Sequence, residues 1–187
     1  MATLTRNRLL SYEEYLSGPT VRQRFEIIDG VIEFMAPAPN KPHQVAVGEF
    51  YALMRTVTAG HGQVFLAPFD VIISRRPLRT RQPDLFYVRN ERLHIVKDQV
   101  EDGPDVVVEI IPPSNRRKAV VEKLADYARI GVRECWMVDI LENRNLQIWR
   151  NESQLFRPVA VFAAGQRVRS EVVPEFELPA LVFPQAD

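Results

Sequence analysis

The stretch DVVVEII, Asp105 to Ile111, is a near-continuous run of β-branched residues, and it decides the fold. A strand that is apolar on both faces is typical of the centre of a sheet covered on both sides. A Pro-Pro-Ser break at 112–114 ends the run, and its serine can cap a helix that extends to about Ile130, with Gly131 as the C′ residue. Because the strand-like stretch ECWMVDI follows, the sequence predicts a strand–helix–strand crossover.

The residues on either side predict further strands and two more helices. FEIIDGVIEFM, Phe25 to Met35, predicts a hairpin, because Asp-Gly between apolar runs favours a type I′ turn. Ser11 can cap a short N-terminal helix, and apolar residues at three- and four-residue spacing predict a second helix from His43 to Thr58. Other strands are expected at 63–66, 69–74, 85–88, 146–150 and 155–162. The sum is a mixed α/β or α+β fold: a central mixed sheet flanked by helices, with an N-terminal helix and hairpin.

Length and composition exclude several classes of protein. The chain has 187 residues, which predicts a single domain, 1–187, at roughly 150 residues per domain. It contains no apolar run of about 18 residues and no visible secretion signal, so we expect a cytoplasmic protein without a membrane span. The single cysteine, Cys135, excludes an internal disulfide and a multi-cysteine zinc site. The 24 basic and 24 acidic residues balance, which argues against non-specific coating of nucleic acid.

Glu109 is the oddest residue of the apolar strand, because an isolated buried carboxylate costs several kcal/mol unless it is paired, protonated or bound to a metal. A metal ligand or catalytic carboxylate is the favoured interpretation, and a glutamate paired with a loop arginine is the alternative. Asp105 lies on the same strand face, but at about 3.3 Å per residue it is roughly 13 Å away, too far to share an ion. We therefore expect the acidic partner on a neighbouring strand, where Asp84 in RQPDLFYV is the natural candidate.

Lys123 is the candidate cation of the site. At about 100° per residue, Val120, Val121, Leu124 and Ala128 form the expected buried stripe of the helix, and Lys123 falls on its border. A lysine in that position can extend over the strand ends where Glu109 would meet its partner, although a solvated helix lysine is an equally good interpretation.

Taken together, these motifs resemble the Uma-two family of the PD-(D/E)xK restriction-endonuclease-like superfamily. The similarity rests on RQPDLFYV, on PDVVVEIIPPSNRRKAVVEKLADYARIGVRECWMVD, and on the stretches FEIIDGVIEFMAPAPNKPHQ and APFDVII. It extends over roughly 11–150, most of the chain. The resemblance implies a restriction-endonuclease-like fold and a metal-dependent endonuclease that hydrolyses DNA.

The resemblance also implies roles for particular residues. Asp84 and Glu109 match the acidic pair that binds the metal, and the backbone carbonyl of Ile110 is the expected third ligand. Hard oxygen ligands favour Mg²⁺ or Mn²⁺. Lys123 matches the lysine that stabilises charge on the reacting phosphate or positions the attacking water.

Two further polar positions of the family are matched by Glu26 and His43. Glu26 could complete the metal shell or hold Lys123. His43 could orient a water or a phosphate, and the alternative is a helix N-terminal histidine bonded to a loop carbonyl.

The chain departs from the family pattern after Glu109. Position 111 of the usual Glu-x-Lys is an isoleucine, so the lysine must come from the helix. Pro112 replaces the usual serine, which removes a hydroxyl and an N–H near the site. The alternative function is therefore a catalytically inactive, nuclease-like module that binds nucleic acid or a protein partner. A hydrolase acting on another substrate has only the acidic residues in its favour. The resemblance implies a homodimer.

Basic residues gather beside the expected site although the net charge is zero. Arg79 and Arg81 precede Asp84, and Arg116 and Arg117 follow the Glu109 strand. We expect these four arginines to contact the phosphate backbone of DNA, because two local basic clusters suffice for such contacts.

Overall fold

The central feature of the computed structural model is a six-stranded sheet built around the apolar strand. The structure describes residues 9–19, 23–35, 41–111 and 117–183. The strand order is β10-β9-β8-β7-β6-β3, with β7 at Val106–Ile110 inside the sheet and every one of its residues buried. The expected central position of the apolar run is confirmed.

The pairing of β7 shows the expected crossover. It lies parallel to β8 (Glu134–Asp139) and antiparallel to β6 (Leu85–Arg89). Helix α3 (Arg117–Arg129) connects β7 to β8, as a parallel pair requires. The other strands of this sheet are β3 (Gly62–Leu66), β9 (Asn145–Glu152) and β10 (Leu155–Ala163), which are all antiparallel to their neighbours.

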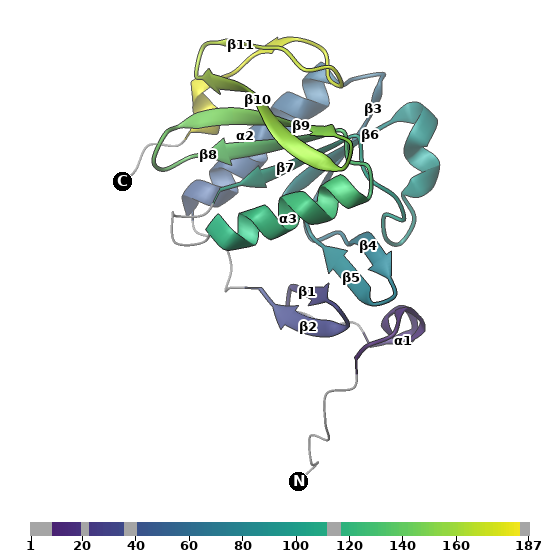
Figure 1. Cartoon of the computed structure of the whole chain (residues 1–187). Helices are drawn as coiled ribbons and strands as arrows, with labels where there is room; N and C mark the ends of the chain where they lie inside the picture. The colour runs from purple at the N-terminus through teal and green to yellow at the C-terminus, as the bar shows by residue number, and fades with distance from the viewer. Residues whose placement is uncertain (1–8, 20–22, 36–40, 112–116, 184–187) are drawn as a thin grey trace.

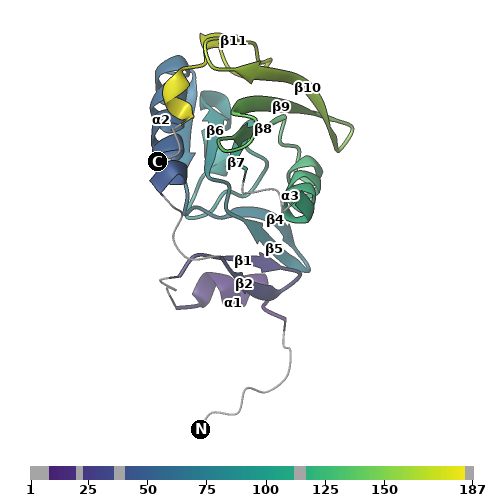
Figure 2. The same cartoon turned by 90° about the vertical axis from the view of Figure 1, so that its left-hand side faces the viewer.

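Helices cover both faces of the sheet, α2 (Lys41–Val57) on one and α3 on the other (Figure 2). Phe50 and Met54 of α2 pack against Trp136 on the first face. Tyr127 and Ala128 of α3 pack on the second face. The C-terminal segment, with β11 (Arg167–Val168), β12 (Phe176–Glu177) and the 3-10 helix η3 (Ala180–Val182), lies on the α2 side and completes the first core.

A second, four-stranded sheet lies beside the first, and Figure 1 shows it between α3 and the N-terminus. Its order is β2-β1-β5-β4, with β1 at Phe25–Ile28, β2 at Val31–Phe34, β4 at Val71–Arg75 and β5 at Leu78–Arg81. The hairpin turn is confirmed, since Asp29 and Gly30 have φ angles of 51° and 82°. Strand β5 was not predicted, because LRTR has no apolar alternation.

The helix boundaries agree with their capping signals. Ser11 caps α1 (Tyr12–Ser17) in a capping box with Glu14. Gly131, at φ 79°, follows α3 as expected, and the predicted cap Ser114 lies outside the described residues. A 3-10 helix, η1 (Asn90–Ile95), was not predicted. In the described part of the chain, no helix is long and apolar enough to cross a membrane.

Candidate active site

Asp84 and Glu109 meet on neighbouring strands. Leu85 pairs with Val108 between β6 and β7, so the preceding Asp84 comes opposite Glu109. The Ile110 N–H donates a hydrogen bond of 2.9 Å to Asp84 Oδ2, which fixes the aspartate against the end of β7. The structure thus brings together the two carboxylates that the sequence predicts as a pair.

Glu109 is buried and held by two side chains of α3. Lys123 Nζ donates to both carboxylate oxygens, at 3.0 and 2.8 Å, and the Tyr127 hydroxyl donates to Oε1 at 2.6 Å. Burial raises the pKa of Glu109, and repulsion from Asp84 adds to the rise, so the pKa lies above its ordinary value although Lys123 opposes the change. The partner of Glu109 is therefore a helix lysine and not a loop arginine.

Asp84 is equally buried but has the opposite pKa shift. His43, near the start of α2, places Nε2 3.3 Å from Asp84 Oδ2. Burial alone would raise the pKa of Asp84, but contact with His43 and the charge of Lys123 hold it below the ordinary value. The pair therefore consists of one carboxylate that stays ionised and one that ionises less readily.

Lys123 is enclosed between two carboxylates. Its side chain is 20% exposed, and Nζ lies 3.7 Å from Glu26 Oε1 of β1 as well as against Glu109. Burial would lower the pKa of Lys123, but the attraction of Glu109 and Glu26 outweighs that effect and keeps the pKa above its ordinary value. The ammonium group is therefore protonated at neutral pH, and the interpretation as a solvated helix lysine was wrong.

The buried face of α3 differs from the stripe that the sequence predicts. Val121 is 64% exposed, whereas Tyr127 is fully buried, so the face turns toward Tyr127 and away from Val121. This rotation places Lys123 and Tyr127, four residues apart, one above the other over Glu109. Tyr127 was not among the predicted site residues, although its spacing from Lys123 could have indicated it.

Two of the arginines predicted to contact DNA are engaged inside the protein. Arg81 is 5% exposed, and its guanidinium lies 2.7 Å from both Glu26 and Asp126. Arg79 pairs with Asp29 and Asp126, each at 2.9 Å. Arg81 neutralises the buried Glu26 and Asp126 and is not proposed as a DNA contact, whereas Arg79 joins the exposed Asp29 to the buried Asp126. Arg116 lies outside the described residues, and Arg117 begins α3.

The acidic pair fits a hard divalent cation by its donor chemistry. Across the described ranges, no group of three or more His, Cys, Asp or Glu side chains is arranged as a metal site. Magnesium ions usually take one or two carboxylates from the protein and fill the remaining positions with water and substrate phosphate. The adjacent carboxylates of Asp84 and Glu109 supply that number of ligands, and their mutual repulsion would be relieved by a cation.

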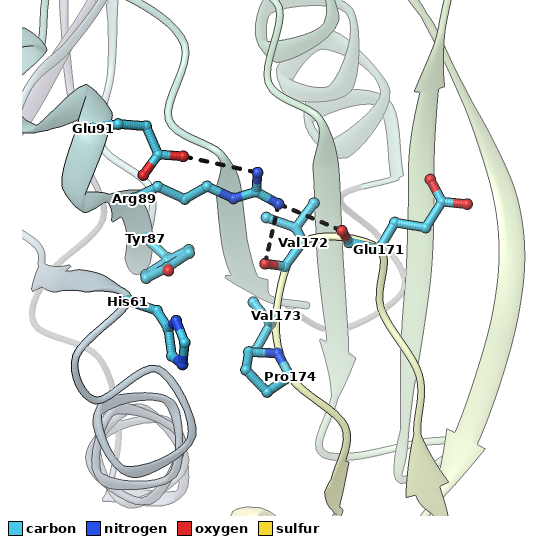
Figure 3. Close-up of a pocket in the computed structure, with 8 residues that line it drawn as sticks. All are labelled: His61, Tyr87, Arg89, Glu91, Glu171, Val172, Val173 and Pro174. Carbon is cyan, nitrogen blue, oxygen red and sulfur yellow. Dashed lines mark hydrogen bonds and ion pairs between the residues drawn. The ribbon is translucent and has the colours of Figure 1, made fainter.

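A hollow of about 380 Å³ lies at the opposite end of β6. In Figure 3, Arg89 reaches across it to the main-chain carbonyls of Glu171 and Val172, each 3.4 Å from the guanidinium. Arg89 is five positions from Asp84 in the sequence, about 17 Å along a strand. None of the predicted site residues lines this hollow, so the candidate active site is the acidic pair.

The chain is similar to proteins described as nucleases. The profile of the Uma2 family, described as "putative restriction endonuclease", matches residues 12–181. One solved structure of similar fold is a "putative nuclease belonging to DUF820" from Anabaena variabilis, with a TM-score of 0.70 and 18% identity over 86% of this chain and 89% of that one. This likeness confirms the expected mixed α+β, restriction-endonuclease-like fold. No curated protein matches the chain.

Proposed function

Because the chain belongs to the Uma2 family of putative restriction endonucleases, we propose that it is a metal-dependent endonuclease that hydrolyses DNA phosphodiester bonds. The observation that carries the proposal is the buried pair Asp84 and Glu109, with Lys123 against Glu109 at 2.8 Å. A fold without catalysis has little use for two adjacent buried carboxylates, because their repulsion costs stability.

Each carboxylate has a distinct part in the proposed site. Asp84 is held by the Ile110 N–H and His43, and its low pKa keeps it ionised as a permanent ligand. Glu109 would hold the metal in place of its contact with Lys123. His43 orients Asp84 and does not itself bind the metal.

Asp84, Glu109 and the carbonyl of Ile110 would hold Mg²⁺ or Mn²⁺, which when bound activates a water and neutralises phosphate charge. Lys123, protonated at neutral pH, supplies a positive charge beside the same acids. In this proposal it stabilises the negative charge that develops on the phosphate. Glu26 holds Lys123 from the other side and is not a metal ligand.

The proposal is tested with supercoiled plasmid in Mg²⁺ or Mn²⁺. We expect metal-dependent nicking by the wild-type protein, abolished by chelation and by Asp84→Asn or Glu109→Gln. Glu33→Gln, a substitution of an exposed glutamate on β2, is the matched control and should nick like the wild type. Nicking that survives both site substitutions would overturn the assignment.

The second candidate is a nuclease-like module that binds nucleic acid or protein without catalysis. The observation in its favour is that Lys123 and Tyr127 already bind the Glu109 carboxylate, so this buried acid has partners without a metal ion. Metal-independent DNA binding in a gel-shift assay, without nicking, would support it. Arg116 and Arg117 remain the proposed DNA contacts, and a homodimer remains a prediction that light scattering tests.

A further inference from the structure

A chain of alternating charges connects the N-terminal hairpin to the acidic pair. It starts at the exposed turn of the hairpin, passes through β5 and α3, and ends on β7. In order, its members are Asp29, Arg79, Asp126, Arg81, Glu26, Lys123 and Glu109. We call this set the charge chain.

The links of the charge chain are not equal. Every ion pair in it is 2.7–2.9 Å long except the contact between Lys123 and Glu26, which is 3.7 Å. Glu26 is also occupied by other donors, since Arg81 binds its Oε2 at 2.7 Å and the Gln82 N–H binds its Oε1 at 3.1 Å. Lys123 is therefore held mainly by Glu109, with Glu26 as a nearby second acceptor.

We propose that Arg81, anchored by Asp126, is a positioning residue that sets how Lys123 is divided between Glu26 and Glu109, and thereby how readily Glu109 binds a divalent cation. The inference rests on the proposed function, in which Asp84 and Glu109 hold that cation. Lys123 and the cation compete for the same carboxylate. Any change that draws Lys123 toward Glu26 therefore frees Glu109.

The signs of the expected effects follow from this competition. Arg81 neutralises much of the charge on Glu26, so Arg81→Met leaves Lys123 as the nearest cation to Glu26 and should tighten metal binding. Glu26→Gln removes the second acceptor, keeps Lys123 on Glu109 and should weaken binding. Arg79→Met makes the same charge change one link further along, where Asp126 keeps Arg81 in place, and should change binding least.

The experiment measures the dissociation constant of Mn²⁺ by titration calorimetry on the full chain without DNA. We expect Glu26→Gln to weaken binding roughly tenfold and Arg81→Met to tighten it roughly tenfold, the size of one partly screened charge interaction, with Arg79→Met within about twofold. Arg81→Lys is the second variant if the Arg81→Met protein does not fold, since one ammonium group cannot replace the two-sided guanidinium. It should tighten binding less than Arg81→Met.

A Lys123→Met background separates positioning from bulk charge. If Arg81 acts through Lys123, Arg81→Met and Glu26→Gln should each change the Mn²⁺ dissociation constant by no more than about twofold in the Lys123→Met background. A double-mutant cycle makes this comparison. Equal effects in both backgrounds would overturn the inference and leave the proposed function intact. If the wild-type protein binds no Mn²⁺, or if its Mn²⁺ binding survives Asp84→Asn, the proposed function is overturned, and the inference with it.

Discussion

Glu109 and Glu134 are both buried carboxylates of the central strand pair, and they are held in different ways. Glu134 opens β8 and accepts hydrogen bonds from the Trp136 indole at 3.0 Å, the Ser170 hydroxyl at 2.6 Å and the Glu171 N–H at 3.1 Å. Glu109, on β7, is held by a lysine and a tyrosine beside a second carboxylate.

We interpret Glu134 as a structural anchor and Glu109 as a reactive group. Glu134 is hydrogen-bonded by two neutral side chains and one main-chain N–H, with the Arg150 guanidinium 3.7 Å from its Oε1, and the contacts with Ser170 and Glu171 fasten the C-terminal segment to the sheet. Glu109 has an ammonium group that can move to a second acceptor, and an acidic neighbour that makes its ionised form costly. Burial alone would not distinguish them, at 7% exposure for Glu109 and 1% for Glu134.

The sharpest way to break this comparison is the same substitution at both positions. Glu109→Gln should lower the nicking rate on the order of 10³-fold, about 4 kcal/mol of barrier, because a metal ligand is lost. Glu134→Gln should stay within about twofold per folded molecule, because it lies on the other face of the sheet. Single-turnover nicking rates of the two variants test this prediction. A loss of similar size in both would show that Glu109 and Glu134 do not differ in role.

Removing the ammonium group of Lys123 should have the next largest effect, on stability. Lys123→Met should cost about 3 kcal/mol of unfolding free energy near pH 8, because it leaves the buried Glu109 carboxylate without its charge partner. The pKa of Glu109 is already raised above 4.5 and would rise further without Lys123. A carboxyl group whose pKa is raised by folding destabilises the folded state once the pH exceeds its unfolded pKa, and this loss grows as the pH rises. The stability lost in Lys123→Met should therefore shrink toward pH 5. Urea unfolding of both proteins at several pH values measures this difference in stability. A difference that does not change with pH would contradict the prediction.

Glu134→Gln tests the anchor by stability. An amide has one acceptor oxygen and a donor NH₂ group, so it cannot accept from three donors as the carboxylate does. We expect a loss of about 2 kcal/mol and faster proteolysis between residues 164 and 175. The exposed Glu175→Gln variant, in the same segment, is the control and should unfold and be cleaved much like the wild type. Glu109→Gln should lower the unfolding free energy by less, because the Tyr127 hydroxyl can rotate to suit the amide.

Tyr127→Phe should give the smallest effect. It removes one hydrogen bond of 2.6 Å from Glu109 and leaves Lys123 in place, so about 1 kcal/mol of stability and a few-fold loss of nicking are expected. Tyr87→Phe, at the hollow beside Arg89, is the matched control. A loss as large as that of Lys123→Met would show that the tyrosine, and not the lysine, governs Glu109.

Local chemistry made much of this predictable from sequence. The Asp29-Gly30 turn and the buried strand each follow from a short-range rule, and the acidic partner of Glu109 was expected on a neighbouring strand because one strand cannot bring Asp105 close enough. Strand β5 and its ion pairs do not, because Arg79 and Arg81 are stabilised by partners that are 45 to 55 residues away along the chain. Charge patterning therefore suggested a DNA-binding patch where the structure has an internal network. The rotation of α3 that buries Tyr127 in place of Val121 likewise depends on contacts across the fold.

The fastening of the C-terminal segment has a consequence for biosynthesis. Side chains as late as Phe183 fill the core between α2 and the sheet, so that core cannot close until the ribosome has released this part of the chain. At about 5–20 residues per second, α2 waits several seconds for these partners after its own synthesis. The α3 face, which carries the acidic pair, draws its latest core residue from β10 and can assemble earlier. The contact of His43 with Asp84, which depends on α2, is therefore the last part of the proposed site to form.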